Sequence, residues 1–206
     1  MKVLILNGSP RVNGNSALAL EQMVNIFKEN QIDVHYVQVG NMDIRGCVAC
    51  ASCHNGNGKC VFDDIVNELA PVFEECDGMV IASPVYYANA NATLIALLDR
   101  LFYSTSFDKR MKVGASVAVA RRGGASATFD QLNKYFTYSG MPLASSQYWN
   151  SVHGGAKGEA AEDLEGLQTM RTLANNMVFL MKSIALGKEK FGLPQKEKPE
   201  RTSFVR

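Results

Sequence analysis

Short apolar stretches of strand length alternate with longer amphipathic stretches of helical period along most of the sequence. The first stretch, residues 3–6, is an unbroken apolar run, typical of a strand covered on both faces of a parallel sheet. Because parallel neighbours need helical, right-handed crossovers, the alternation predicts an α/β protein with a doubly wound parallel sheet. Strands are expected at residues 3–6, 32–39, 77–83, 112–120 and 143–148, and helices at 17–30, 62–75, 89–107, 125–140 and 159–186.

The length and charge of the chain limit its organisation and its partners. With 206 residues it is long enough for one domain with a substantial core, which we place at residues 1–186. The remaining tail, residues 187–206, is rich in Lys, Pro and Glu and is expected to be a free end or an arm lying on a partner subunit. The formal net charge of +1, without clustered Lys or Arg before the tail, argues against nucleic-acid and membrane partners.

The sequence also favours a cytoplasmic location. No apolar run approaches the roughly 20 residues that span a bilayer, and the N-terminus is typical of a strand rather than a signal peptide.

The loop after the first strand has the composition of a phosphate site. It combines hydroxyl and amide side chains, two glycine-marked bends and a guanidinium just before a helix begins. Helix N-terminal N–H groups, hydroxyls and a positive charge are what a phosphate monoester needs. An ordinary helix cap is the competing interpretation. The loop lacks both the P-loop and the dinucleotide patterns, so neither ATP nor a Rossmann-bound nicotinamide is indicated. The residues assigned to the anion site are Ser9, Arg11, Asn15 and Ser16.

Two further loops should meet the first, because ligands of a doubly wound sheet bind at the carboxyl ends of its strands. Residues 83–91 offer a proline, two tyrosines and several amides, against which a flat heteroaromatic ring could lie. Residues 121–124 offer two arginines and two glycines. Taken separately, these tyrosines could be core or interface aromatics and these arginines solvated surface charges. Their convergence under one topology supports a single site.

These motifs together resemble the NADPH-dependent FMN reductase family of flavodoxin-like proteins. They are GSPR-x-x-GNS from Gly8, SPVYY-x-N-x-N from Ser83, RRGG from Arg121 and YWN-x-x-HG from Tyr148, and the likeness runs from Met1 to about Gly155. The resemblance implies a five-stranded sheet of order 2-1-3-4-5, non-covalent FMN, and a homodimer or homotetramer.

The resemblance also implies roles for the loop residues. The anion site would hold the FMN phosphate, and Arg121, Arg122, Gly123 and Gly124 would close on the pyrimidine end of the isoalloxazine. The ring itself would contact Pro84, Val85, Tyr86 and Tyr87.

The implied activity is electron transfer from NAD(P)H through FMN to a small acceptor such as a quinone, a nitro or azo compound, or free flavin. No side chain is expected to act as a catalytic residue, because the cofactor carries the chemistry. The acceptor and the choice between NADH and NADPH are not determined by the sequence.

Four cysteines lie within fourteen residues on a Gly- and Asn-rich segment: Cys47, Cys50, Cys53 and Cys60. This spacing could ligate a metal or a cubane cluster, and it is similar to that of the iron-sulfur flavoproteins, in which four cysteines hold a [4Fe-4S] cluster. The alternative function is therefore an electron carrier with a cluster and FMN. Zinc prefers two separated pairs, and plain reduced thiols are the other competing interpretation. Cys76 is expected to be a buried structural thiol.

Overall fold

The computed structural model describes residues 1–56, 58–200, 202 and 204. In chain order, its elements are β1 (Lys2–Asn7), α1 (Asn15–Glu29), β2 (Asp33–Gln38), α2 (Ser52–Asn55), α3 (Ile65–Glu75), β3 (Gly78–Pro84), α4 (Ala92–Ser104), β4 (Val113–Ala120), α5 (Ala125–Tyr138), β5 (Ser151–His153), the 3₁₀ helix η1 (Glu159–Glu162) and α6 (Leu164–Phe191).

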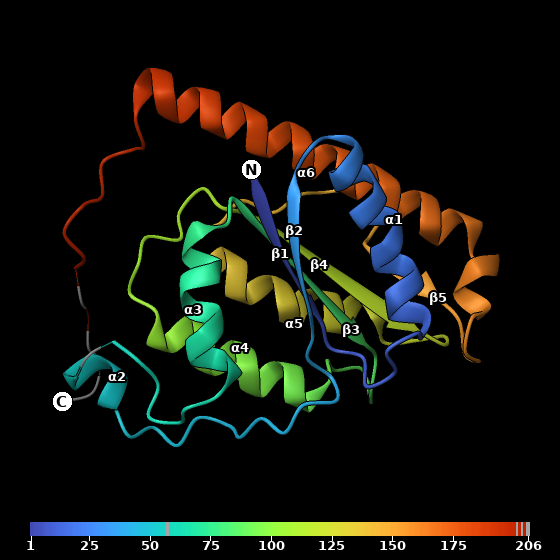
Figure 1. Ribbon diagram of the computed structural model, residues 1–206, viewed down its shortest axis with the longest axis horizontal. Coiled ribbons are helices and arrows are strands. Elements are labelled where there is room, and N and C mark those ends of the chain that lie inside the picture. Colours follow the sequence, from blue (N-terminus) through green and yellow to red (C-terminus); the bar gives the residue numbers. More distant parts are fainter. Residues whose placement is uncertain (57, 201, 203, 205–206) are drawn as a thin grey trace.

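A parallel sheet forms the centre of the domain, with helices on both faces (Figure 1). Within the described residues it has five strands in the order β2-β1-β3-β4-β5, so the predicted topology is confirmed. Along β1, Val3 and Ile5 face α1 and α6, whereas Leu4 and Leu6 face α3, α4 and α5. This alternation explains the unbroken apolar run, because a strand covered on both sides needs apolar residues at every position.

The predicted fifth strand, residues 143–148, is wrong. Leu143 forms a single parallel bridge to Gly114 of β4, and the chain then leaves the sheet until β5, which pairs with Ala118–Ala120. The intervening residues are held toward α6, since Asn176 donates to the Ser145 carbonyl at 2.7 Å and Ser146 donates to the Thr169 carbonyl at 2.7 Å. Hydrogen bonds to α6 thus hold this segment where the pairing along this edge of β4 is interrupted.

Several helix ends differ from the prediction because capping residues define them. Asp64 caps α3 by accepting from the Val66 N–H, and Asn91 caps α4 by accepting from the Thr93 N–H, so both helices begin later than expected. The predicted last helix is divided: residues 159–162 form η1, and Asp163 caps α6 by accepting from the Gly166 N–H. Helix α6 then continues five residues past the expected end, to Phe191.

Each helix of the described residues is too short or too polar to cross a lipid bilayer.

Candidate functional site

The carboxyl ends of the strands gather toward the lower right of Figure 1, where the loop after β1 begins. This loop is anchored to its neighbours: the Gly8 N–H donates to the Ala82 carbonyl at 2.7 Å, and the side chain of Gln38 donates to the Ser9 carbonyl. A side chain at Gly40 would overlap the main chain of Gly8 and Ser9, so only glycine allows the chain after β2 to pass this closely. The loop therefore has a fixed path.

The end of this loop retains the chemistry of an anion site. Ser9 is buried, and its Oγ lies 3.2 Å from the Arg11 N–H. The N–H groups of Asn15 and Ser16, the first two residues of α1, have no acceptor in the described part of the chain. The Arg11 side chain is exposed and has no polar partner within that part. Free N–H groups at a helix start beside an unpaired guanidinium favour an anion.

The loop after β3 is fastened to the first loop through Asn91. The Asn91 amide donates to the Gly8 carbonyl at 2.8 Å, and its N–H donates to the Ser83 hydroxyl at 2.8 Å. Asn91 is buried, so this amide acts inside the protein rather than on a ligand.

The tip of the same loop is a tight turn. Tyr86 and Asn89 exchange two backbone hydrogen bonds of 2.9 Å, and the two residues between them have positive φ, 51° at Tyr87 and 60° at Ala88. Non-glycine residues rarely adopt this left-handed conformation, which costs roughly 1–2 kcal/mol for each residue. The Tyr87 side chain is 100% exposed, so its ring has no packing contact with the described residues that could offset this cost.

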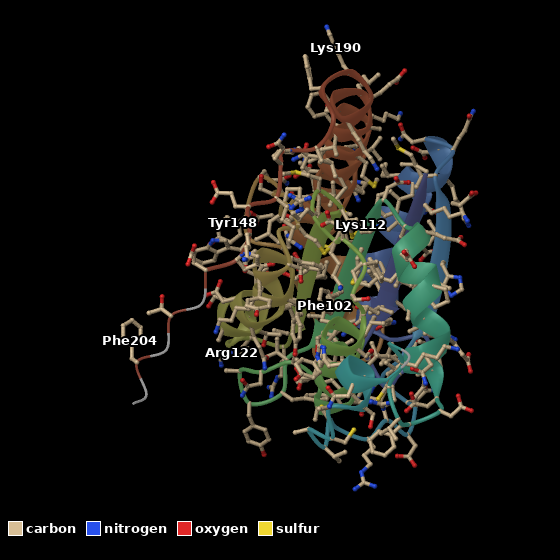
Figure 2. The ribbon with its side chains drawn as sticks, turned by 90° about the vertical axis from the view of Figure 1, so that its left-hand side faces the viewer. Phe102, Lys112, Arg122, Tyr148, Lys190 and Phe204 are labelled. Atoms are coloured by element: carbon tan, nitrogen blue, oxygen red, sulfur yellow. The ribbon has the colours of Figure 1, made fainter. Side chains whose placement is uncertain are left out.

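The loop after β4 packs against this turn. Gly124 has a φ of +90°, and a Cβ atom there would lie 2.9 Å from both Val85 Cγ1 and Ala88 Cα. Glycine is thus required both by the backbone conformation and by the close approach of the two loops. Arg121 and Arg122 are exposed, and Figure 2 shows Arg122 at the surface of the domain.

A fourth loop, after β5, completes the arrangement, and no site residue was predicted in it. Its glycines let the chain pass against Arg121 and Asn15. The Asn15 amide donates to the Ala156 carbonyl at 2.9 Å, and Asn15 Oδ1 accepts from the Gly158 N–H at 2.9 Å. The Gly154 N–H donates to the carbonyl of Ala120 at 3.0 Å. The glycine-rich run after His153 was the available signal for this loop.

The four loops therefore form a closed ring of contacts around one edge of the sheet, which we call the loop ring (residues 8–15, 84–91, 120–124 and 154–158). The structure brings the three predicted segments together there. Asn15 differs from the prediction in one respect, because its side chain is used to hold the fourth loop and only its N–H remains free for an anion.

Charge around the loop ring is mostly positive. The guanidinium groups of Arg11, Arg121 and Arg122 are exposed, and the carboxylate of Glu159 lies near Arg121. Hydrogen bonds from the N–H groups of Ala156 and Gly155, together with the charge of Arg121, lower the pKa of Glu159. Glu159 thus stays ionised and holds the fourth loop, while Arg11 and Arg122 remain available to a negatively charged ligand.

The four clustered cysteines occupy a second place, beside α4. All four line one cavity of about 20 Å³ whose walls are mostly apolar, together with Arg100 and Tyr103 of α4. Arg100 is 1% exposed and its Nε donates to Cys60 Sγ at 3.2 Å. Burial opposes its charge, but hydrogen bonds to Asp64 and to Cys60 raise the pKa of Arg100 above its ordinary value.

The backbone between the cysteines curves around this cavity, which we call the cysteine cavity. Ala49 and Ala51 both have positive φ, 53° and 57°, and the Ala49 N–H points to Cys47 Sγ at 3.5 Å. Hydrogen bonds from the side chain and main chain of Ser52 lower the pKa of the Cys50 thiol. Cys50 thus has an environment that favours the thiolate.

No three His, Cys, Asp or Glu side chains of the described residues are close enough to ligate a single ion. A cubane cluster binds each thiolate to a different iron, so its ligands stand farther apart than those of one ion. Four thiols lining one apolar cavity fit that donor set better than a mononuclear site.

Two histidines near these sites, His54 and His153, and the fifth cysteine, Cys76, have structural surroundings. His54 packs edge-on against the Tyr103 ring, with ring centres 4.5 Å apart. The His153 N–H donates to Asp163 Oδ2 at 2.6 Å, which ties β5 to the start of α6. Cys76 is buried, as expected.

Comparison with known proteins places this architecture among flavoproteins. The family model described as NADPH-dependent FMN reductase matches residues 1–156. An iron-sulfur flavoprotein of Methanocaldococcus jannaschii is 32% identical over 192 residues, which cover 89% of this chain and 99% of the relative. An iron-sulfur flavoprotein of Methanosarcina thermophila is 30% identical over 195 residues, covering 92% of this chain and all of the relative (100%).

Solved structures resemble this chain in fold. An NAD(P)H:quinone oxidoreductase from Methanothermobacter marburgensis has a TM-score of 0.67 at 15% identity, over 86% of this chain and 96% of that one. A flavodoxin from the domain Archaea has a TM-score of 0.59 at 14% identity, over 88% of this chain and 99% of that one. At these identities the likeness shows the fold alone, which is flavodoxin-like.

Proposed function

The chain belongs to the NADPH-dependent FMN reductase family and, within it, to the iron-sulfur flavoprotein branch, and on that premise we propose an oxidoreductase with two redox centres. One centre is FMN in the loop ring, and the other is a [4Fe-4S] cluster in the cysteine cavity. The observation that carries the proposal is the pairing of a loop ring that has free helix N–H groups and exposed arginines with a cavity lined by four thiols, the two being joined by α4.

The residues of the loop ring fit a flavin mononucleotide. The free N–H groups of Asn15 and Ser16, the Ser9 hydroxyl and the Arg11 guanidinium would hold the phosphate. The isoalloxazine would lie against residues 84–87, and Arg121, Arg122, Gly123 and Gly124 would face its pyrimidine end, where negative charge collects on reduction.

A bound FMN would supply hydride-transfer and one-electron chemistry. The protein contributes orientation and charge: the contact of Gly124 with Val85 and Ala88 fixes the two loops that would flank the ring. Asn91 fixes the phosphate loop relative to them. No side chain is required to move a proton to or from substrate.

We propose NAD(P)H as the electron source and a small molecule, such as a quinone, a nitro or azo compound or free flavin, as the acceptor. The exposed rings of Tyr86 and Tyr87 beside the proposed flavin site support an acceptor that is planar and aromatic. Steady oxidation of NADH or NADPH by the FMN-loaded protein with a quinone tests this activity. Absence of turnover with both nucleotides and with each acceptor class would contradict it.

A second candidate activity is electron transfer between protein partners, with the cluster and FMN as the two redox centres. The cysteine cavity favours it, because Cys47 and Cys50 are exposed and lie where a partner could approach. Helix α4 links the two centres: its cap, Asn91, belongs to the loop ring, and Arg100, nine residues on, reaches the cavity about 13 Å farther along the axis.

Purification without oxygen tests both centres at once. We expect flavin absorbance together with iron and acid-labile sulfide in the proportion of one cubane cluster per chain. The matched control is Cys60→Ser, which should lose the cluster and keep FMN. Protein that is yellow but free of iron would contradict the cluster and leave the NAD(P)H-dependent reductase, and colourless protein that refuses added FMN would contradict the flavin site.

We also propose that the protein is a homodimer or homotetramer. Exposed aromatic side chains at Tyr87, Tyr138, Tyr148 and Trp149 support a subunit interface, and Figure 2 shows Phe204, which is 92% exposed, standing clear of the domain. Such an arm is suited to lie on a neighbouring subunit.

A further inference from the structure

The Arg100 guanidinium uses all of its donors inside the protein. It is 1% exposed and has five N–H groups, and five hydrogen bonds leave it. Two reach the carboxylate of Asp64, at 2.6 and 2.8 Å, and two reach the carbonyls of Arg45 and Phe62, at 3.1 and 3.4 Å. The fifth, from Nε, reaches Cys60 Sγ at 3.2 Å.

Four of these bonds have a structural explanation. Arg45 precedes the first cysteine and Phe62 follows the last, so Arg100 fastens both ends of the cysteine segment to α4. Asp64 balances the buried charge and caps α3. The bond to Cys60 adds nothing to this fastening, because the Cys60 main chain is already held by Asn67 at 2.9 and 3.0 Å.

We propose that Arg100 is a positioning residue that sets the reduction potential of a cluster bound in the cysteine cavity, through its hydrogen bond to the sulfur of Cys60. This inference rests on the proposed function. Hydrogen bonds to cluster sulfurs and the net charge nearby determine how readily a cluster accepts an electron. A cation donating to one ligand sulfur stabilises the reduced, more negative state, so the potential is held at a more positive value.

Asp64 should act in the opposite direction, since its carboxylate partly cancels the charge of Arg100. Arg100→Met removes the donor and leaves that carboxylate beside the cluster. Asp64→Asn keeps a side chain of the same shape, retains an oxygen for the cap of α3 and leaves the Arg100 charge uncompensated. The two substitutions therefore shift the potential to opposite sides of the wild-type value.

The experiment is a redox titration of the anaerobically purified protein, followed by electron paramagnetic resonance of the reduced cluster, with iron and sulfide measured for each variant. We expect a more negative midpoint for Arg100→Met and a more positive one for Asp64→Asn. The matched control is Asn67→Ala, which loosens the Cys60 main chain without removing the bond to its sulfur, and its midpoint should stay close to wild type.

Iron-loaded Arg100→Met with the wild-type midpoint would overturn the inference, and so would an Asn67→Ala shift as large as that of Arg100→Met. If Arg100→Met fails to fold, Asp64→Asn decides alone: a positive shift supports the inference and an unchanged midpoint overturns it. Wild-type protein free of iron and sulfide would overturn the inference together with the cluster on which it rests. Normal iron content with unchanged midpoints would overturn the role of Arg100 and leave the cluster standing.

Discussion

Arg11 and Asn15 are both assigned to the phosphate by the sequence, but their side chains have different surroundings. Arg11 is exposed and has no polar partner among the described residues, whereas the Asn15 amide bridges to Ala156 and Gly158. One residue is thus available to a ligand, and the other holds the loop ring together.

Arg11→Ala should weaken FMN binding roughly tenfold, or about 1.4 kcal/mol, because a charge-assisted contact to the phosphate is lost. Its thermal stability without flavin should be unchanged. Asn15→Ala, the matched variant, should lower both the melting temperature and the affinity, since it releases the fourth loop. Flavin titration by fluorescence and thermal unfolding separate the two effects, and equal flavin affinity in wild type and Arg11→Ala would contradict the assignment.

The role of Asn15 could not be predicted from its neighbours in the sequence. Its partners lie 141 and 143 residues away, so no local pattern indicates the contact. The motif around it was predictable because free N–H groups at a helix start depend on local sequence. The same distinction applies to Asn91, whose partner Gly8 is 83 residues distant.

The Cys76 thiol should make stability depend on pH under alkaline conditions. Burial raises its pKa from 9.0 to about 11. The folded state thus binds this proton more tightly than the unfolded state, so the contribution is complete below pH 9 and is lost as the pH rises toward 11. The loss is on the order of 2–3 kcal/mol.

Chemical denaturation in reducing buffer between pH 8 and pH 11 measures this loss. The comparison is with Cys76→Ala, which is less stable near neutral pH because it loses packing. The difference in unfolding free energy between wild type and variant should shrink across that range, and a constant difference would argue against the assignment.

At the scale of the elements, apolar periodicity was enough to predict the four strands β1 to β4, because each carries its own pattern, whereas the strand order rested on the family resemblance. The position of the fifth strand, at the edge next to β4, was not predictable in this way. Residues 143–148 resemble a strand in composition, but α6 holds Ser145 and Ser146 away from the sheet. Competition between a helix and a strand edge for the same segment depends on tertiary packing, which local patterns do not contain.

Two glycines should respond to alanine in opposite ways. A Cβ at Gly114 of β4 would lie 2.5 Å from Phe136 Cγ of α5, so Gly114→Ala should destabilise the protein by about 1–3 kcal/mol. Nothing lies within 4 Å of a Cβ at Gly187 in α6, so Gly187→Ala should stabilise by about 0.5–1 kcal/mol. Urea denaturation measures both, and changes of the same sign would contradict the packing described here.

At the scale of the whole molecule, the segment after α6 contributes no residue to the buried core of the described part of the chain. It contacts the body through Arg110, which donates to the Pro194 carbonyl at 3.1 Å, and Phe204 is exposed. A chain ending at Gly192 should therefore fold with an unchanged melting temperature at low concentration and form smaller assemblies. Light scattering on a sizing column tests this, and an unchanged mass would show that the interface lies elsewhere.

Helix α4 fixes the geometry of the molecule in one more way. Its first turn is locked to the loop ring by Asn91 and its later turns to the cysteine segment by Arg100. Adding one residue between these two would rotate the far end by about 100° and advance it by about 1.5 Å, turning Arg100 away from Asp64. The number of residues in α4 between Asn91 and Arg100 is therefore fixed, because a single inserted or deleted residue would break one of these two contacts.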